Sequence, residues 1–288
     1  MSQPVCVVDA GAELGEGTVW DPDARVLWWI DIWGRRVHRY NPDTGENNSW
    51  ETPEYPGCLG IRENGGLVMS MGAGFSYFDP AHGQVTAIVQ PEAGHDNIRF
   101  NDGRVDRQGR FWSGSMFEAS NQPIEFAGSL FRLDPDLSVH RIETDIGCSN
   151  GLAWSPDSRT MYFADSHAHL VWAYEFDALT GEAGGRRIFI DLRASQAIAD
   201  GATVDAEGCY WLAIPRTHKV CRFDPDGRLV LDIVFPTEAP TCCEFGGSNL
   251  DILYVTTAAR GLRHQPHAGG LFAVEAGVRG LPTAKFKG

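Results

Sequence analysis

Polar residues whose side chains bind cations stand directly before glycines at recurring intervals along the chain. They are Glu16, Asp102, Asn150 and Asp200, each followed by a glycine. Leu59 precedes a fifth glycine, and the five glycines are 43 to 50 residues apart. A sixth copy has Cys242 and Cys243 in place of the glycine motif. If the structure repeats with this period, the four polar side chains occupy equivalent places in successive repeats.

Carboxylates at equivalent places around a narrow opening repel one another unless protons or a cation compensate their charge. A divalent cation held by Glu16, Asn150 and Asp200 removes this repulsion, because two carboxylates neutralise the ion and the amide oxygen adds a neutral ligand. Oxygen ligands suit Ca²⁺, the ion we expect, as well as Mg²⁺ and Mn²⁺. Zn²⁺ and Fe²⁺ stay open as alternatives, since three protein ligands leave positions for water. Taken singly, an Asn-Gly or Asp-Gly pair indicates only a turn.

The segments that carry these residues belong to a repeated β-hairpin pattern. An apolar segment, a polar turn and a second apolar or aromatic segment recur, most clearly at residues 105–112, 154–162 and 204–211. A third segment follows each hairpin and ends in Asp-Pro or Asn-Pro in four copies, and a fourth usually comes next. Six copies of roughly 40–50 residues predict an all-β, six-bladed β-propeller of four-stranded antiparallel blades, in one domain over residues 1–288. A two-sheet sandwich would not require six near-equal copies.

A propeller explains why the polar residues should meet. The first strand of each blade lines the central channel, so residues at the start of these strands converge on one face. The structural hypothesis therefore places Glu16, Asp102, Asn150 and Asp200 around one mouth of the channel.

The composition limits the partners of the chain. A net charge of −14 and a pI near 5.0 disfavour nucleic acid and anionic lipid, but not a neutral sugar-like molecule or a cation. No apolar run is long enough to span a bilayer, and no signal peptide is visible. Seven irregularly spaced cysteines favour reduced thiols, and we expect a cytoplasmic protein.

Five motifs together resemble those of the regucalcin, gluconolactonase and sugar-lactonase family, and the resemblance covers essentially the whole chain. The motifs are LGEGTVW at 14–20, RFNDG at 99–103, SNGLAWSPD at 149–157, ADGATVD at 199–205, and FGG at 245–247 with LYVTTA at 253–258. The family resemblance implies a six-bladed propeller with one divalent metal at the channel mouth. It implies that Glu16, Asn150 and Asp200 are the metal ligands and that Arg99, Asn101 and Glu118 contact the substrate.

The usual activity of that family implies hydrolysis of a small-molecule sugar (aldono) lactone to the aldonic acid. Asp200 is then the expected catalytic general base, because it is a carboxylate beside the metal. Phosphotriester or aryl-ester hydrolysis and a non-catalytic calcium-binding propeller are the alternatives. The chain departs from the family's sequence pattern at the segment IPRTH, residues 214–218, where many members have a glycine-containing loop. The sequence carries no prediction of oligomeric state.

Overall fold

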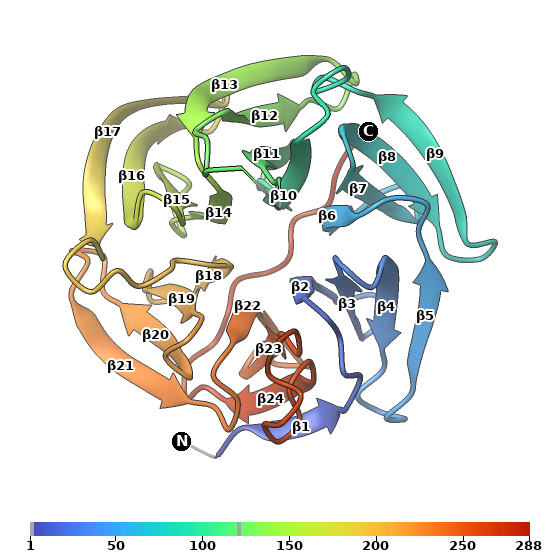
Figure 1. Ribbon diagram of the computed structural model, residues 1–288, viewed down its shortest axis with the longest axis vertical. Helices are drawn as coiled ribbons and strands as arrows, with labels where there is room; N and C mark the ends of the chain where they lie inside the picture. The colour runs from blue at the N-terminus through green and yellow to red at the C-terminus, as the bar shows by residue number, and fades with distance from the viewer. Residues whose placement is uncertain (1–2, 120–121) are drawn as a thin grey trace.

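The computed structural model describes residues 3–119 and 122–288, and the chain in these ranges forms six four-stranded antiparallel sheets arranged in a ring (Figure 1). The predicted six-bladed β-propeller is therefore confirmed. The first blade contains β2 (Gly15–Asp21), β3 (Val26–Asp31), β4 (Arg36–Tyr40) and β5 (Asn47–Glu51). The second contains β6 (Pro56–Ile61), β7 (Leu67–Met71), β8 (Gly74–Asp79) and β9 (Gln84–Val89).

The next three blades follow the same order from the channel outward. The third contains β10 (Ile98–Val105), β11 (Phe111–Phe117), β12 (Gly128–Leu133) and β13 (Val139–Ile146). The fourth contains β14 (Ser149–Trp154), β15 (Thr160–Asp165), β16 (Leu170–Asp177) and β17 (Glu182–Asp191). The fifth contains β18 (Ala202–Val204), β19 (Tyr210–Ile214), β20 (Lys219–Phe223) and β21 (Leu229–Val234).

The sixth blade is built from both ends of the chain. Its inner strands are β22 (Pro240–Gly246), β23 (Ile252–Thr257) and β24 (Leu271–Glu275), and its outermost strand is β1 (Val5–Val8). Cys6 of β1 pairs with Phe272 of β24, and a register shift separates Cys6 from Val8. Figure 1 shows this N-terminal strand lying against the last blade. The ring is thus closed by a strand that the repeat pattern does not reveal.

Burial falls from the channel outward within each blade. Every residue of β14 is buried, whereas β17 at the rim of the same blade is mostly exposed. Aromatic side chains join neighbouring blades, as in the Trp112–Trp154 pair with ring centroids 5.8 Å apart and the Tyr162–Tyr210 pair at 5.1 Å. Such contacts add to the hydrophobic stabilisation, so the aromatic residues hold the blades together. No helix of the described residues could span a membrane.

The hairpin turns confirm that the blades are equivalent. In the third blade, Asp106 accepts a hydrogen bond from the Trp112 indole at 2.9 Å. In the fifth blade, Asp205 accepts the matching bond from Trp211 at 2.8 Å. In these two blades the matching Asp and Trp therefore fix the turn to the strand that follows it, because the aspartate satisfies the buried indole N–H.

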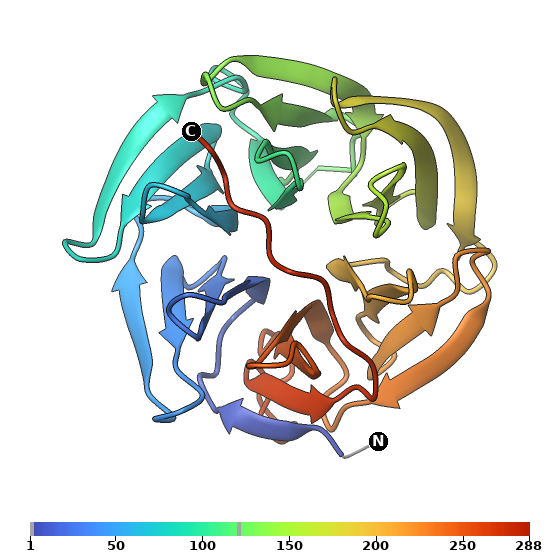
Figure 2. The same cartoon turned by 180° about the vertical axis from the view of Figure 1, so that it is seen from behind.

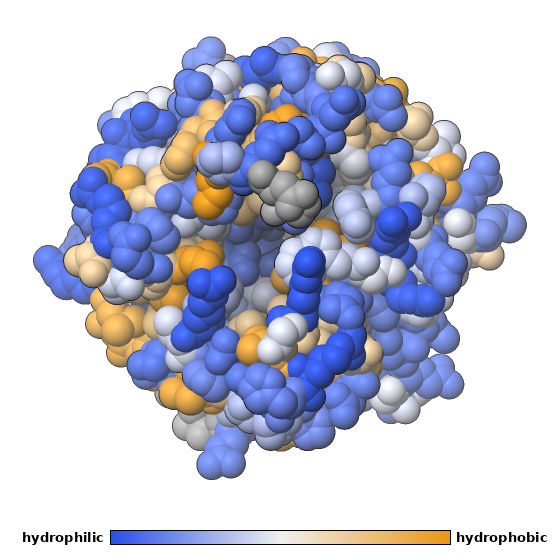
Figure 3. All heavy atoms as spheres, in the orientation of Figure 1, coloured by the Kyte–Doolittle hydropathy of each residue, from blue (hydrophilic) through white to orange (hydrophobic). Residues whose placement is uncertain are grey.

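The C-terminal segment, residues 276–288, crosses one mouth of the central channel, in front of the blades in Figure 2. Near its end, the Phe286 amide donates to the Ile61 carbonyl at 2.8 Å, and the Phe286 ring is fully buried beside Phe111. Earlier in the segment, the Arg279 carbonyl accepts a hydrogen bond from the Ala206 amide at 2.8 Å. The chain itself thus covers this mouth. Figure 3 shows the opposite face, which is hollowed near its centre among hydrophilic residues.

Candidate functional site

The channel-lining strands carry bulges at the predicted site residues. The pairing of β2 with β3 shifts register between Glu16 and Val19, and the pairing of β14 with β15 shifts between Asn150 and Ala153. Gly17 and Gly151 lie in these bulges with φ of 58° and 60°, a left-handed conformation that glycine adopts without strain. A bulge bends a strand and changes the direction of its side chains. Gly17 and Gly151 therefore allow Glu16 and Asn150 to turn away from the regular strand.

Three carboxylates meet at this end of the channel. Glu16 and Asp102 are buried, and Asp200 is partly exposed. Burial, followed by the negative charges of Asp200 and Asp102, raises the pKa of Glu16 well above its usual value. Desolvation and the charge of Asp102 raise the pKa of Asp200 to about 8. Burial also raises the pKa of Asp102, although the Arg104 guanidinium partly offsets it.

No Lys or Arg forms an ion pair with Glu16, Asp102 or Asp200 within residues 3–119 and 122–288. Carboxylates in such a position bind protons or a cation, since like charges at close range cannot all stay ionised. The raised pKa values of Glu16 and Asp200 reflect burial first and this repulsion second. The donor set, which is made of carboxylate oxygens and one amide, fits a hard divalent cation.

Asn150 is held in a fixed orientation beside the carboxylates. Its amide nitrogen donates to Ser166 Oγ at 2.8 Å, and Ser166 Oγ in turn donates to the Ala199 carbonyl at 2.5 Å. The same amide contacts Asp200 and lowers the pKa of that carboxyl, against the larger effect of burial. Ser166 therefore fixes the orientation of the Asn150 amide beside the carboxylates. The structure thus brings the predicted ligands Glu16, Asn150 and Asp200 together.

The three predicted substrate residues form one network next to this cluster. Arg99 is buried; its Nε is paired with Glu118, and its Nη1 donates to Asn101 Oδ1 at 2.7 Å. Asn101 Nδ2 donates to the Ser149 carbonyl at 2.9 Å and lies 3.4 Å from Asn150 Oδ1. The Arg99–Glu118 pair forms part of the wall of a cavity of about 460 Å³. All six residues predicted from the sequence thus lie at or beside one mouth of the channel.

The sequence motifs do not identify two residues near the site, Arg104 and Cys242. The half-buried Arg104 reaches across the channel, pairs with Glu244 and donates to the Ala202 carbonyl at 2.7 Å. Cys242, in the copy that lacks the glycine motif, accepts a hydrogen bond from Thr18 Oγ1 at 3.3 Å. A charged residue directly after the Asp102-Gly103 motif is a signal that could have pointed to Arg104.

The unusual segment 214–218 forms the turn between β19 and β20, on the side of the site. The Asp200 amide donates to the Ala213 carbonyl at 3.0 Å, so the end of β19 lies next to Asp200. The turn is tight, because Thr217 Oγ1 donates to the Ile214 carbonyl at 2.5 Å and both Arg216 and His218 have positive φ. This segment therefore borders the candidate site.

Known proteins resemble this chain in both sequence and structure. A 6-deoxy-6-sulfogluconolactonase from Pseudomonas putida is 37% identical over 98% of each chain, and regucalcin from Xenopus laevis is 35% identical over 98% of each. The structure of a calcium-binding protein, regucalcin, from Agrobacterium tumefaciens superposes with a TM-score of 0.93 at 27% identity, covering 99% of this chain and 97% of that one. A gluconolactonase from Xanthomonas campestris superposes with a TM-score of 0.75 at 26% identity, covering 94% and 88%.

Residues 14–259 match the family model described as the SMP-30/Gluconolactonase/LRE-like region, and this span contains all six predicted site residues. Together with the relatives that match from end to end, this shows that the chain belongs to the SMP-30/gluconolactonase/LRE-like family.

Proposed function

We propose that this protein hydrolyses a sugar lactone to the aldonic acid, with one divalent cation, Ca²⁺ in our reading, held by Glu16, Asn150 and Asp200. The observation that carries the proposal is the set of carboxylates without a cationic partner among the described residues, next to the polar network of Arg99, Asn101 and Glu118. The names of the lactonase relatives support the reaction, and the name of the calcium-binding relative supports the ion.

The bound cation would supply Lewis acidity toward the lactone carbonyl or a water molecule. Asp200 is the proposed general base, since among the three carboxylates it alone is partly exposed. Its carboxylate would take the proton of the attacking water and pass it to the ring oxygen that leaves. Asn150, fixed by Ser166, would keep the position of Asp200 relative to Glu16.

Arg99 and Asn101 are proposed to bind and orient the substrate. Arg99 uses Nε and Nη1 for contacts with the protein, and no hydrogen bond among the described residues uses its Nη2. This donor can therefore reach a hydroxyl or the carbonyl oxygen of a lactone in the adjoining cavity, where charge develops during the attack. Glu118 holds the guanidinium in place and accepts hydrogen bonds from sugar hydroxyls.

A lactone panel tests the proposal directly. The purified protein is stripped with a chelator and reloaded with Ca²⁺, Mg²⁺, Mn²⁺ or Zn²⁺, and acid release is followed in a pH-stat with gluconolactone, other aldonolactones and 6-deoxy-6-sulfogluconolactone. We expect turnover of at least one sugar lactone that disappears on stripping and returns with Ca²⁺. Turnover of paraoxon or an aryl ester alone would replace the proposal with the esterase alternative. Calcium binding without turnover of any substrate would favour the non-catalytic one.

A further inference from the structure

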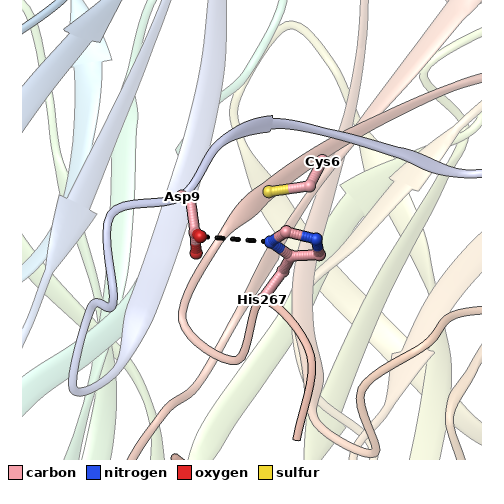
Figure 4. A group of neighbouring side chains, drawn as sticks. All are labelled: Cys6, Asp9 and His267. Carbon is pink, nitrogen blue, oxygen red and sulfur yellow. Dashed lines mark ion pairs between the residues drawn. The ribbon is translucent and has the colours of Figure 1, made fainter.

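A second group of metal-binding side chains lies at the outer edge of the sixth blade, away from the channel cluster. Cys6 belongs to β1, Asp9 follows that strand, and His267 lies in the loop between β23 and β24 (Figure 4). One possible ligand atom from each of the three lies within 4.8 Å of the others. His267 Nδ1 and Asp9 Oδ2 are 3.1 Å apart. The figure shows the Cys6 sulfur, the Asp9 carboxylate and the His267 ring pointing toward one another.

The geometry suits a tetrahedral transition-metal site. Zinc binds thiolate, imidazole and carboxylate at distances that put neighbouring ligand atoms about 3.3 to 3.8 Å apart. His267 Nδ1 and Asp9 Oδ2 are 3.1 Å apart, and the Cys6 sulfur lies within 4.8 Å of both side chains. The Asp9 and His267 side chains are 64% and 50% exposed, so they have room for the small movements that would bring the three ligand atoms to the tetrahedral spacing. An ion pair this exposed stabilises the fold little, so the contact between Asp9 and His267 does not by itself explain the arrangement.

The backbone around the three residues is held in place by contacts of its own. The Ala12 amide donates to the Gly269 carbonyl at 2.9 Å, which joins the loop of His267 to the segment after Asp9. His267 has a left-handed φ of 54°, and the Gly270 amide donates to its carbonyl at 2.9 Å. A Cβ atom at Gly270 would come within 2.9 Å of the Cys6 sulfur, so the glycine makes room for the thiol. The ligands thus sit on a preformed frame, as a metal site requires.

We propose that Cys6, Asp9 and His267 bind a thiophilic divalent metal of the zinc class, with water completing the coordination. The set differs from the channel cluster, which offers carboxylate and amide oxygens and suits harder ions. A metal here would join β1 to the blade it completes and would strengthen a closure that otherwise rests on four residues of β1 and its register shift. The proposal does not depend on the lactonase function.

A cysteine nucleophile is the other chemistry that these three residues could suggest. Burial and the charge of Asp9 raise the pKa of Cys6 to about 11, so the group is a thiol rather than a reactive thiolate at neutral pH. A metal ion would displace the thiol proton to the buffer and form the metal–sulfur bond, with no change of oxidation state.

Cobalt substitution tests the site by its thiolate signature. The stripped full-length protein is titrated with Co²⁺, and the sulfur-to-cobalt charge-transfer absorbance is recorded together with the metal content. We expect about two cobalt ions per wild-type chain, a charge-transfer band, and loss of the band and of one ion in Cys6→Ser. His267→Asn should also lose the band, and asparagine accepts the left-handed backbone, so this variant should keep its fold.

Two controls separate this site from the channel. Asp200→Ala should keep the band while it loses the other ion. Cys148→Ser and Cys242→Ser should keep the band and both ions, because Cys148 and Cys242 are thiols near the channel cluster. Zinc should raise the Tm of Asp200→Ala, whereas it should leave the Tm of the double variant Cys6→Ser with Asp200→Ala unchanged, because that variant lacks both sites. A wild-type protein without the band, or a band that survives Cys6→Ser, would overturn the proposal. Variants that bind no cobalt at Cys6 but hydrolyse lactones would leave the proposed function untouched.

Discussion

Carboxylates at the two ends of the central channel differ in whether a cationic side chain pairs with them. At the depth of Arg104, the Glu244 carboxylate meets a guanidinium that also donates to the Ala202 and Leu152 carbonyls. Beyond this level, the C-terminal segment covers the mouth, since Leu281 and Ala284 share a small cavity with Arg104 and Glu244. At the other mouth, Glu16 and Asp200 have no cationic partner within the described residues, and their pKa values rise.

This difference separates a structural carboxylate from a candidate functional one. A buried charge that is paired and hydrogen-bonded is compatible with a stable core, whereas uncompensated carboxylates cost stability until a ligand arrives. Asp102 lies between the two cases, because burial raises its pKa and Arg104 partly lowers it. The comparison therefore predicts different results when carboxylates from the two ends are removed.

Loss of Asp200 should have the largest effect. Asp200→Ala removes a proposed ligand and the proposed base, and we expect lactone turnover to fall by about a thousandfold or more. The measurement is pH-stat hydrolysis at saturating Ca²⁺. Asp226→Asn, an exposed carboxylate in the turn between β20 and β21, is the matched control and should keep wild-type turnover. Wild-type turnover in Asp200→Ala would contradict the assignment.

Loss of Glu244 should damage stability rather than chemistry. Glu244→Gln leaves the half-buried Arg104 guanidinium without its charged partner, and we expect the free energy of unfolding to drop by about 3–5 kcal/mol. Urea denaturation measures the change, and lactone turnover of the folded protein should stay within a few-fold of wild type. The double variant Arg104→Met with Glu244→Gln should recover much of the loss. A stable single variant with no turnover would show that both ends of the channel serve the reaction.

The free energy of unfolding of the metal-free protein should depend on pH because of Asp200 at the open mouth of the channel. The pKa of Asp200 is raised from 3.8 in the unfolded chain to about 8 in the folded protein, so the folded state binds more protons between these values. Its contribution to stability is therefore present below about pH 4 and is lost as the pH rises toward 8.

We expect the difference in unfolding free energy between wild type and Asp200→Asn to change by about 1 to 3 kcal/mol across this window. Urea denaturation at pH 4.5, 6 and 8 measures it, and saturating Ca²⁺ should abolish the change. An unchanged difference with and without Ca²⁺ would mean that the cation does not bind among these carboxylates.

Removal of the Asp102 charge should have the smallest effect of these changes. It tests whether Asp102 acts as a metal ligand or only supports the ligands through its charge. Asp102→Asn removes a charge that acts on both Glu16 and Asp200 but leaves the three proposed ligands in place. We expect Ca²⁺ affinity to fall by about tenfold, the size of the loss on removing a supporting partner. Isothermal titration of the stripped protein measures it. A loss as large as that of Asp200→Ala would make Asp102 a fourth ligand.

The repeat pattern predicted much of this arrangement because each blade is a local structure. Hairpins such as 105–112 and 204–211 fold from neighbouring residues, and the motif recurs once per blade at the start of the strand that lines the channel. Glu16, Asn150 and Asp200 could therefore be placed together from the sequence. The Arg104–Glu244 pair joins residues 140 positions apart. Neither residue belongs to the glycine motif, so their contact depends on the closed ring rather than on any local pattern.

The positions of β1 and of the segment 276–288 were even harder to predict from the sequence. Val5–Val8 is too short to stand out as a strand, and its partner β24 lies at the far end of the sequence. The segment 276–288 has no strand pattern, and its path over the channel depends on acceptors and pockets from several blades. The roles of the six predicted site residues stay predictions until the experiments above are done, although their proximity is now described.

The placement of β1 in the last blade has a consequence for how the protein is made. β1 leaves the ribosome before the other 23 strands, yet its partner β24 (Leu271–Glu275) is the last strand of the described chain to emerge. The earliest segment must therefore wait, unpaired, while the other blades assemble beside it, and the final pairing closes a loop that spans almost the whole chain. Ring closure would then be the slow, late step of folding. Residues added before β1 would therefore change the folding rate more than the stability of the folded protein.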